Sequence, residues 1–277
     1  MATPHLPQEI LDYVIDLLHD EPETLRRCYL VSKSWVPRTR KHLFADVELR
    51  SASDLESWKW IFPDVAHSPA HQTQTLFVGC PQLITESDAE EGGWIRAFSG
   101  VKSLDVDNGD QHFITSEVSL TPFYKFSPSL KSLRVAAIIL PHPGLFDLIL
   151  SFPLLEDLTL AGYKEPALDD DGSREPQTIV PSASPIFTGS LEFGGLQGAG
   201  DIARQLLDLP GGLHFRRLAL ARDDRAEALQ WMMELVAKCS HTLESLDVAY
   251  SFRRMSIHTR SVPITHSVYS WVRVGLV

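Results

Sequence analysis

The hexapeptide VKSLDV spans Val101 to Val106, and LKSLRV repeats its pattern from Leu130 to Val135. Each consists of an apolar residue, two variable residues, a leucine, one variable residue and a final apolar residue. Alternate side chains of an extended strand point to the same face, so the leucine and the final residue share one face. The pattern therefore predicts short strands that bury one of their two faces.

The same pattern recurs at a nearly constant spacing. Three more complete copies are Leu155–Leu160, Phe215–Leu220 and Leu243–Val248, and two weaker copies are Leu76-x-Val78 and Leu191-x-Phe193. The central leucines are Leu76, Leu104, Leu133, Leu158, Leu191, Leu218 and Leu246, so their spacing is 25 to 33 residues. This is close to the period of about 20–29 residues of leucine-rich repeats. We predict an α/β fold with an irregular leucine-rich-repeat-like solenoid over residues 73–250. A plain α/β domain with leucines placed by chance is the alternative.

Helical patterns separate the predicted strands. Apolar residues fall on one face of Leu145–Phe152 and of Ile202–Leu209, where Asp201 is a suitable N-cap. Arg225–Ser240 is the longest such stretch. Strand, turn and helix in alternation predict a sheet that lines one face of the solenoid.

Residues 6–35 differ from the repeats and read LPQEILDYVIDLLHDEPETLRRCYLVSKSW. Pro7 lies where the first turn of a helix tolerates proline, and apolar residues from Ile10 onward form a wide face. Pro22 separates this helix from a second one that carries Leu25 and Cys28 inward. Three short helices in about 45 residues cannot bury this apolar surface alone, and small domains usually need a partner or a neighbouring core. Periodicity by itself favours a helical cap on the next domain.

The two ends of this stretch resemble an F-box. Leu6-Pro7-x-Glu9-Ile10-Leu11 opens it, and Val31-Ser32-Lys33-x-Trp35 closes it, with Ser32 where many members have cysteine. The resemblance implies that residues 1–49 bind the Skp adaptor and, through it, the cullin of a ubiquitin ligase. The adaptor-binding residues that it implies, some of them partly in the small core, are Leu6, Pro7, Ile10, Leu11, Leu25, Cys28, Val31, Ser32 and Trp35.

The repeats extend the resemblance to about Tyr250. Leu209–Leu220 and Cys239–Val248 are similar to repeats of mushroom-type fungal F-box proteins. The resemblance implies a non-catalytic substrate receptor of the ligase, whose repeats bind a protein substrate that the sequence does not identify. An adaptor-bound interaction scaffold outside any ligase is the alternative, and a small-molecule enzyme built on a solenoid is a weaker rival.

Strand alternation predicts which side chains face the protein substrate. They are the variable residues of the five complete copies: Ser103, Asp105, Ser132, Arg134, Asp157, Thr159, Arg217, Ala219, Ser245 and Asp247.

Two further segments complete the predicted organisation. Residues 50–72 are interpreted as a helical joint, in which Ser53–Glu56 is a capping box that starts a short helix. Residues 251–277 show no repeat pattern and are predicted to form an irregular tail, either native or the product of a truncated gene. Residues 167–185 contain several acids and prolines and are predicted to form a loop.

Composition excludes several classes of function. The net charge of −11 argues against nucleic acid as the main partner. No run of about 18 apolar residues exists and no secretory signal is recognisable, so we expect no membrane partner. Cys28, Cys80 and Cys239 lack the spacing of a metal site or a disulfide, which indicates a reducing compartment, the cytoplasm or the nucleus. The acid-free, basic segment between Thr24 and Ala45 fits a solvated face, or a surface that attracts an acidic partner, better than a nucleic-acid site.

Motifs that suggest chemistry are incomplete, so we predict no cofactor, no metal and no catalytic residue. The glycines of Gly194–Gly200 are in the wrong order for a dinucleotide site and lack the lysine of a phosphate-binding loop. His67 and His71 lack further zinc ligands, and Asp169–Gly172 lacks the spacing of a calcium loop. Trp58, Trp94 and Trp231 lie in helical patterns and are predicted to belong to the core.

Overall fold

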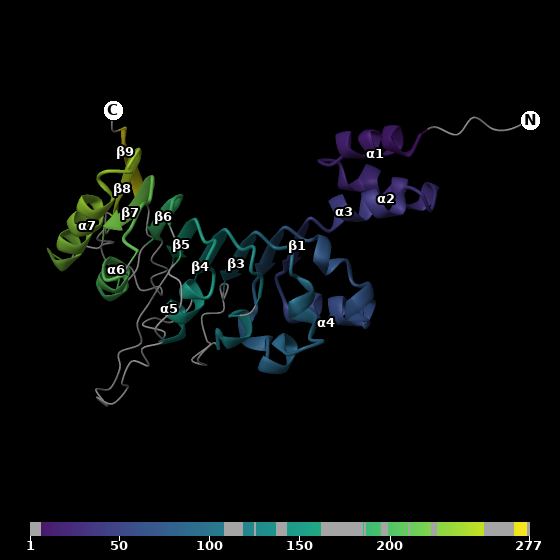
Figure 1. Ribbon diagram of the computed structural model, residues 1–277, viewed down its shortest axis with the longest axis horizontal. Helices are drawn as coiled ribbons and strands as arrows, with labels where there is room; N and C mark the ends of the chain where they lie inside the picture. The colour runs from purple at the N-terminus through teal and green to yellow at the C-terminus, as the bar shows by residue number, and fades with distance from the viewer. Residues whose placement is uncertain are drawn as a thin grey trace, which may run out of the picture.

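The computed structural model describes residues 7–107, 119–124, 126–136, 143–161, 185, 187–194, 199–209, 211–222, 226–251 and 269–275. Within these ranges the chain is an α/β protein in which strands alternate with helical segments (Figure 1). The strands are β1 (Asp46–Leu49), β2 (Thr75–Val78), β3 (Ser103–Asp107), β4 (Ser132–Ala136), β5 (Asp157–Ala161), β6 (Ser190–Gly194), β7 (Arg217–Arg222), β8 (Ser245–Ser251) and β9 (Tyr269–Gly275).

The helices fall into an N-terminal group and a layer along the sheet. The α-helices are α1 (Gln8–Leu17), α2 (Pro22–Val31), α3 (Val36–Leu43), α4 (Ala52–Ile61), α5 (Pro143–Leu150), α6 (Ala199–Leu207) and α7 (Ala226–Cys239). Short 3₁₀ turns are η1 (Val65–His67), η2 (Pro69–Gln72), η3 (Pro81–Leu83), η4 (Glu86–Ala89), η5 (Trp94–Ala97) and η6 (Thr121–Phe123).

The strands form one sheet in strict chain order. Each strand from β2 to β8 pairs in parallel with the one before it, and β9 is antiparallel to β8. The register places Leu104, Leu133 and Leu158 opposite one another, in the same row as Leu76, Leu191 and Leu218. All six of these leucines are fully buried. The α/β class and the buried positions of the strands are therefore those that the hexapeptide predicts.

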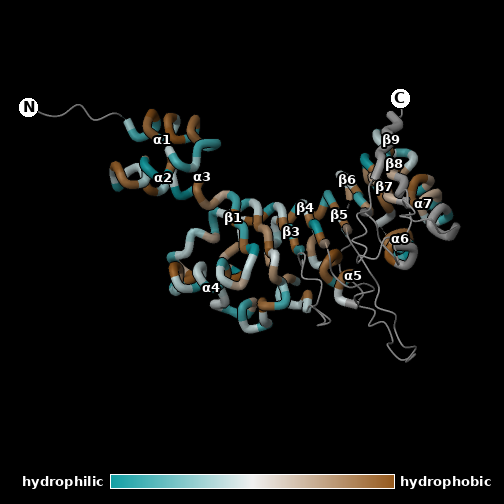
Figure 2. The backbone as a smooth tube through the Cα atoms, turned by 180° about the vertical axis from the view of Figure 1, so that it is seen from behind, coloured by the Kyte–Doolittle hydropathy of each residue, from teal (hydrophilic) through white to brown (hydrophobic). Residues whose placement is uncertain are grey.

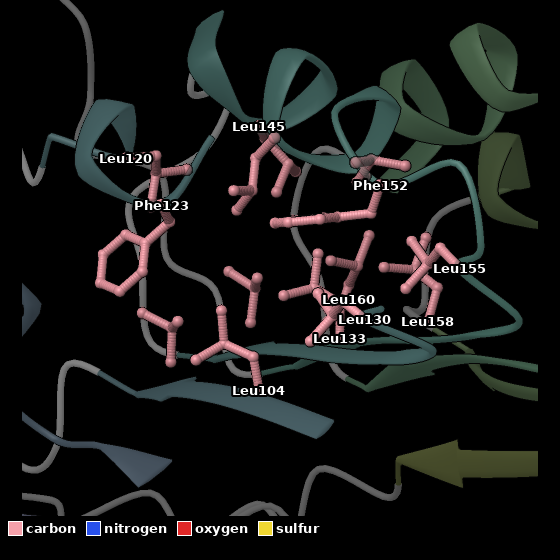
Figure 3. Close-up of a cluster of buried hydrophobic side chains, with 14 of the residues drawn as sticks. Leu104, Leu120, Phe123, Leu130, Leu133, Leu145, Phe152, Leu155, Leu158 and Leu160 are labelled. Atoms are coloured by element: carbon pink, nitrogen blue, oxygen red, sulfur yellow. The ribbon is translucent and has the colours of Figure 1, made fainter. Parts of the chain in front are cut away.

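The core lies between the sheet and the layer of helices and turns. Figure 3 shows Leu104, Leu133 and Leu158 of the strands pointing toward Leu145 and Phe152 of the helical side. The predicted core tryptophans Trp58, Trp94 and Trp231 are all buried, as are Phe98, Phe126, Phe187 and Phe215. One continuous cluster of buried side chains runs from Val47 to Leu243.

Proline marks the starts of the N-terminal helices. Pro7 is the N-cap of α1, and Pro22 and Pro37 lie in the first turns of α2 and α3. Each ring occupies a position at which a helix has no amide hydrogen bond to lose. The three helices pack on one another through α2–α3 and α1–α3 contacts and stand at one end of the sheet (Figure 1).

The predicted boundary at residue 49 and the predicted joint over 50–72 need correction. Asp46–Leu49 is the first strand of the sheet, because Val47 and Leu49 bury the same face as the repeat leucines. The helix α4 then contributes Leu55 and Trp58 to the same core. Phe44, at the end of α3, packs edge-on against Trp58 at a centroid distance of 6.1 Å, so aromatic contact connects the helices to the sheet.

Several local boundaries also differ from the prediction. The capping box of α4 is Ser51 with Asp54 rather than Ser53 with Glu56, because the Asp54 carboxylate accepts a hydrogen bond from the Ser51 backbone amide at 3.0 Å. Asp201 lies inside α6, which begins at Ala199.

The C-terminal tail is not irregular throughout. Tyr269–Gly275 forms β9, and its register with β8 runs from Tyr269 opposite Ser251 to Gly275 opposite Ser245. Its sequence, YSWVRVG, is rich in the aromatic and β-branched residues that favour strands. The predicted loop over 167–185, apart from residue 185, and residues 195–198 of the glycine-rich segment lie outside the described residues.

Candidate protein-interaction sites

The helix α1 exposes apolar side chains of the kind that a helix normally buries against a core. Ile10 is 49% exposed, Tyr13 62%, Val14 44% and Leu17 64%. Their spacing of three and four residues places them on one helical face. Burial of apolar surface contributes about 25 cal/mol per Å², so this uncovered face provides a driving force for association.

The end of α2 presents a second exposed apolar group. Leu30 is 82% exposed and Val31 66%, and Tyr29 is also exposed. Figure 2 shows the concentration of hydrophobic residues in α1. The helices nevertheless have their own small core, because Ile15, Leu25 and Cys28 are buried.

The predicted adaptor-binding residues therefore divide into two sets. Pro7, Ile10, Val31 and Ser32 are exposed, and Leu11 and Trp35 are half-buried. Leu25 and Cys28 are buried inside the helical module, where they support its fold, and Leu6 lies outside the described residues.

Sequence reasoning did not include Tyr13, Leu17 or Leu30 among the contact residues. Apolar residues occur around most of α1 and α2, so periodicity alone does not decide which of them point inward. The signal available in the sequence was the excess of apolar residues over what a small helical module can bury.

An ion cluster fixes α1 on α3. The Arg38 Nε donates to Asp16 Oδ1 at 2.5 Å, Arg38 Nη2 pairs with Oδ2, and His42 Nε2 lies 2.7 Å from Oδ1. Hydrogen bonds from Arg38, and to a lesser extent from His42, hold the pKa of the Asp16 carboxyl well below its usual range. The orientation of the exposed face of α1 therefore depends on a charged Asp16.

The polar face of the sheet is the second candidate surface. Register places Phe77, Asp105, Arg134, Thr159, Glu192, Ala219 and Asp247 in one row across β2–β8, on the face opposite the leucines. Figures 1 and 2 show α4 and α5 on one side of the strands and no described helix over the other side of β2–β6. The predicted substrate-facing residues Ser103, Asp105, Ser132, Arg134, Asp157, Thr159, Arg217, Ala219, Ser245 and Asp247 all lie on this face, and none of them is buried.

The best-defined feature of this face is an ion pair between neighbouring strands. Arg134 Nη1 lies 2.7 Å from Asp105 Oδ1 and 3.3 Å from Asp107 Oδ2. Burial raises the pKa of Asp105, and the nearby Asp107 acts in the same direction, whereas Arg134 opposes the shift. These charges are partly desolvated before any partner binds.

The surroundings of two buried cysteines and of two loop histidines are well defined. Burial raises the pKa of the Cys239 thiol to about 11 and also raises that of Cys80, whereas a nucleophilic cysteine needs a lowered pKa. No cluster of three or more metal-ligating side chains occurs in the described ranges. His67 instead pairs with Asp64 at 2.5 Å, and His71 Nδ1 bonds to the Ser68 carbonyl oxygen at 2.8 Å.

The same ranges contain no helix whose length and apolar character would allow it to cross a membrane. Searches of family models, of curated proteins and of solved structures found no match for this chain. The sequence motifs and the two surfaces described above are therefore the features of this chain that bear on its function.

Proposed function

We propose that this chain is a substrate receptor of a cullin-based ubiquitin ligase. Its N-terminal helices are an F-box that binds a Skp adaptor, and its repeats are an irregular leucine-rich-repeat-like solenoid that binds a protein substrate. The observation that carries the proposal is the exposed apolar surface of α1 and α2, within the segment that has the F-box pattern.

The helical module is folded but incompletely covered, as expected of a docking module. Ile15, Leu25 and Cys28 fill its interior, while Ile10 and Val31 remain exposed. An apolar groove on the adaptor would cover these side chains, and interface energy concentrates in a few such anchors. The basic, acid-free segment between Thr24 and Ala45 supports a partner of negative charge.

The architecture also supports the task of a receptor. The Phe44–Trp58 contact and the pairing of β1 with β2 join the module to the sheet without a long linker. A substrate on the polar sheet face would then be held at a fixed distance from the adaptor. Such a receptor performs no bond chemistry, and its contribution to ubiquitin transfer is proximity.

The proposal is tested by co-expression with a Skp adaptor, followed by size-exclusion chromatography. We expect a one-to-one complex with the unaltered chain. Ile10→Ala with Val31→Ala should weaken it strongly, because each buried anchor contributes about 1–3 kcal/mol.

A matched control distinguishes the module from general hydrophobicity. Leu154→Ala with Met233→Ala removes two apolar side chains that are 54% and 64% exposed in the repeats, and should leave the complex intact. Separate elution of the unaltered chain and the adaptor would overturn the proposal. A complex that forms but does not recruit cullin would favour the alternative, an adaptor-bound scaffold outside a ligase.

A further inference from the structure

A cavity of about 670 Å³ lies where the N-terminal helices meet the first strands of the sheet. Four separate segments line it: α1, the region from Ser34 to Lys41, the turn around Gln72, and Gly100 to Lys102. Ligand pockets for small molecules usually measure about 300–1,000 Å³, so this cavity has room for a molecule larger than a single ion.

The charge of the lining is positive, in contrast to the acidic chain as a whole. Arg38, Lys41 and Lys102 contribute cations, and Asp12 is the only carboxylate in the lining. The Asp12 carboxylate already accepts the Gln8 side-chain amide at 2.7 Å.

Two of the three cations have no carboxylate partner within the described part of the chain. Arg38 pairs with Asp16, whereas Lys102 Nζ donates to the neutral Gln74 Oε1 at 3.4 Å and forms no ion pair within the described ranges. Lys41 is exposed and forms no ion pair among the described residues. Two ammonium groups without a carboxylate partner among the described residues therefore line one cavity, together with the side-chain amides of Gln72 and Gln74 as further potential donors.

We propose that this cavity binds a phosphate-bearing ligand. Phosphate offers several strong acceptor oxygens and about two negative charges at neutral pH, which matches two free lysines better than a single carboxylate would. The phosphate could come from a small phosphorylated molecule or from a phosphoserine side chain. The proposal does not rest on adaptor binding.

The test is calorimetric titration of the full chain at low salt with three probes: tripolyphosphate, a phosphoserine peptide and the same peptide without phosphate. We expect at least one phosphorylated probe to bind and the unphosphorylated peptide not to bind. Tripolyphosphate binding alone would identify a small-molecule source, and phosphopeptide binding alone would identify a protein source. Binding of neither phosphorylated probe would overturn the proposal.

Paired variants localise the site. Lys41→Ala with Lys102→Ala should weaken binding by about ten-fold or more, because hydrogen bonds to charged groups are the strong ones. The matched control, Lys33→Ala with Lys238→Ala, removes the same charge at exposed positions outside the cavity and should leave affinity nearly unchanged.

A third variant should change the affinity for phosphate in the opposite direction. Asp12→Asn removes the one carboxylate in the lining and keeps its shape, so affinity should increase several-fold while the fold is retained. Equal weakening by the cavity pair and by the control pair, or weaker binding by Asp12→Asn, would show that the phosphate does not bind in this cavity.

Discussion

At the scale of single residues, Asp16 supports the exposed apolar face of α1. It is the point at which α1 is fixed to α3, through Arg38 and His42. Asp16 can therefore control the orientation of the exposed residues of α1, although it is not one of them.

Replacing Asp16 with asparagine should loosen α1. The lowered pKa means that a charged Asp16 stabilises the folded state above its ordinary pKa of about 4, and this contribution is lost as pH falls below that value. Because the carboxylate is about one-third exposed, we expect a loss of only about 1 kcal/mol at pH 7. Hydrogen exchange of the α1 amides measures this loss of stability. The difference between the variant and the unaltered chain should shrink below about pH 4.

The control for this experiment is Asp20→Asn, at a carboxylate that is 87% exposed and lies 3.2 Å from His19 Nε2. It should leave α1 exchange unaltered. Equal effects of the two variants would mean that the Asp16 pairing does not hold the helix.

Arg134 has a comparable role on the polar sheet face. Arg134→Met leaves Asp105 and Asp107 close together without their cation, and should destabilise the fold by about 1–2 kcal/mol at pH 7, an amount reduced by their partial exposure. Burial already raises the pKa of Asp105, so at a mildly acidic pH its protonation should remove part of the unpaired charge and reduce the difference in stability from the unaltered chain. Urea unfolding at the two pH values measures this.

Lys131→Met is the matched change for Arg134→Met. Lys131 pairs with Glu156 at 2.7 Å, but both side chains are 41% or more exposed. Loss of this ion pair should lower the free energy of unfolding by about 0.5 kcal/mol or less at either pH. A loss for Arg134→Met that does not depend on pH would contradict the assigned role of Asp105.

At the scale of elements, the strand β5 contributes a buried row and an open row. Leu158 and Leu160 of β5 are fully buried, whereas Thr159 between them lies on the opposite face. One face of the strand therefore contributes to the core, whereas the opposite face contributes little to stability.

Two adjacent substitutions test this division. Leu158→Ala should destabilise the protein by about 2–5 kcal/mol, because it leaves a cavity in the core. Thr159→Ala should change stability by about 0.5 kcal/mol or less. Chemical denaturation of both variants provides the measurement, and similar losses would show that the sheet is buried on both faces.

At the scale of the whole molecule, a continuous core joins the first strand to the last helix. The core cluster includes Val47 at one end and Cys239 and Leu243 at the other, whereas Ile15, Leu25 and Cys28 are buried separately in α1–α3. The candidate adaptor surface is thus on a small unit attached to a larger and more extensively packed one.

This division predicts where an adaptor would change hydrogen exchange. On the proposed function, adding the Skp adaptor should slow exchange in α1 and α2 and leave the central strands β4 and β5 unaltered. The reason is that the exposed apolar residues lie on the helices and the strands are already protected by the core. Protection spread evenly over both units would contradict a docking site confined to the module.

The sequence by itself determined the α/β class, the alternation that buries one face of each strand, and the residues on the opposite face. These features follow from local periodicity, because alternate residues of a strand always share a face. The position of Pro7 at the start of the first helix was readable for the same reason, since the preference of proline for this position depends on the first turn alone.

Only the tertiary structure decided the remaining features. It placed Asp46–Leu49 in the sheet, exposed Leu30 and Leu17, joined Asp16 to Arg38 and His42, and brought Lys41 and Lys102 to one cavity. Each of these features depends on contacts between segments separated by tens of residues, or on which of several apolar side chains is packed against another segment. Local pattern has no information about the path of the chain between such segments, and that path determines both the exposed surface and the cavity.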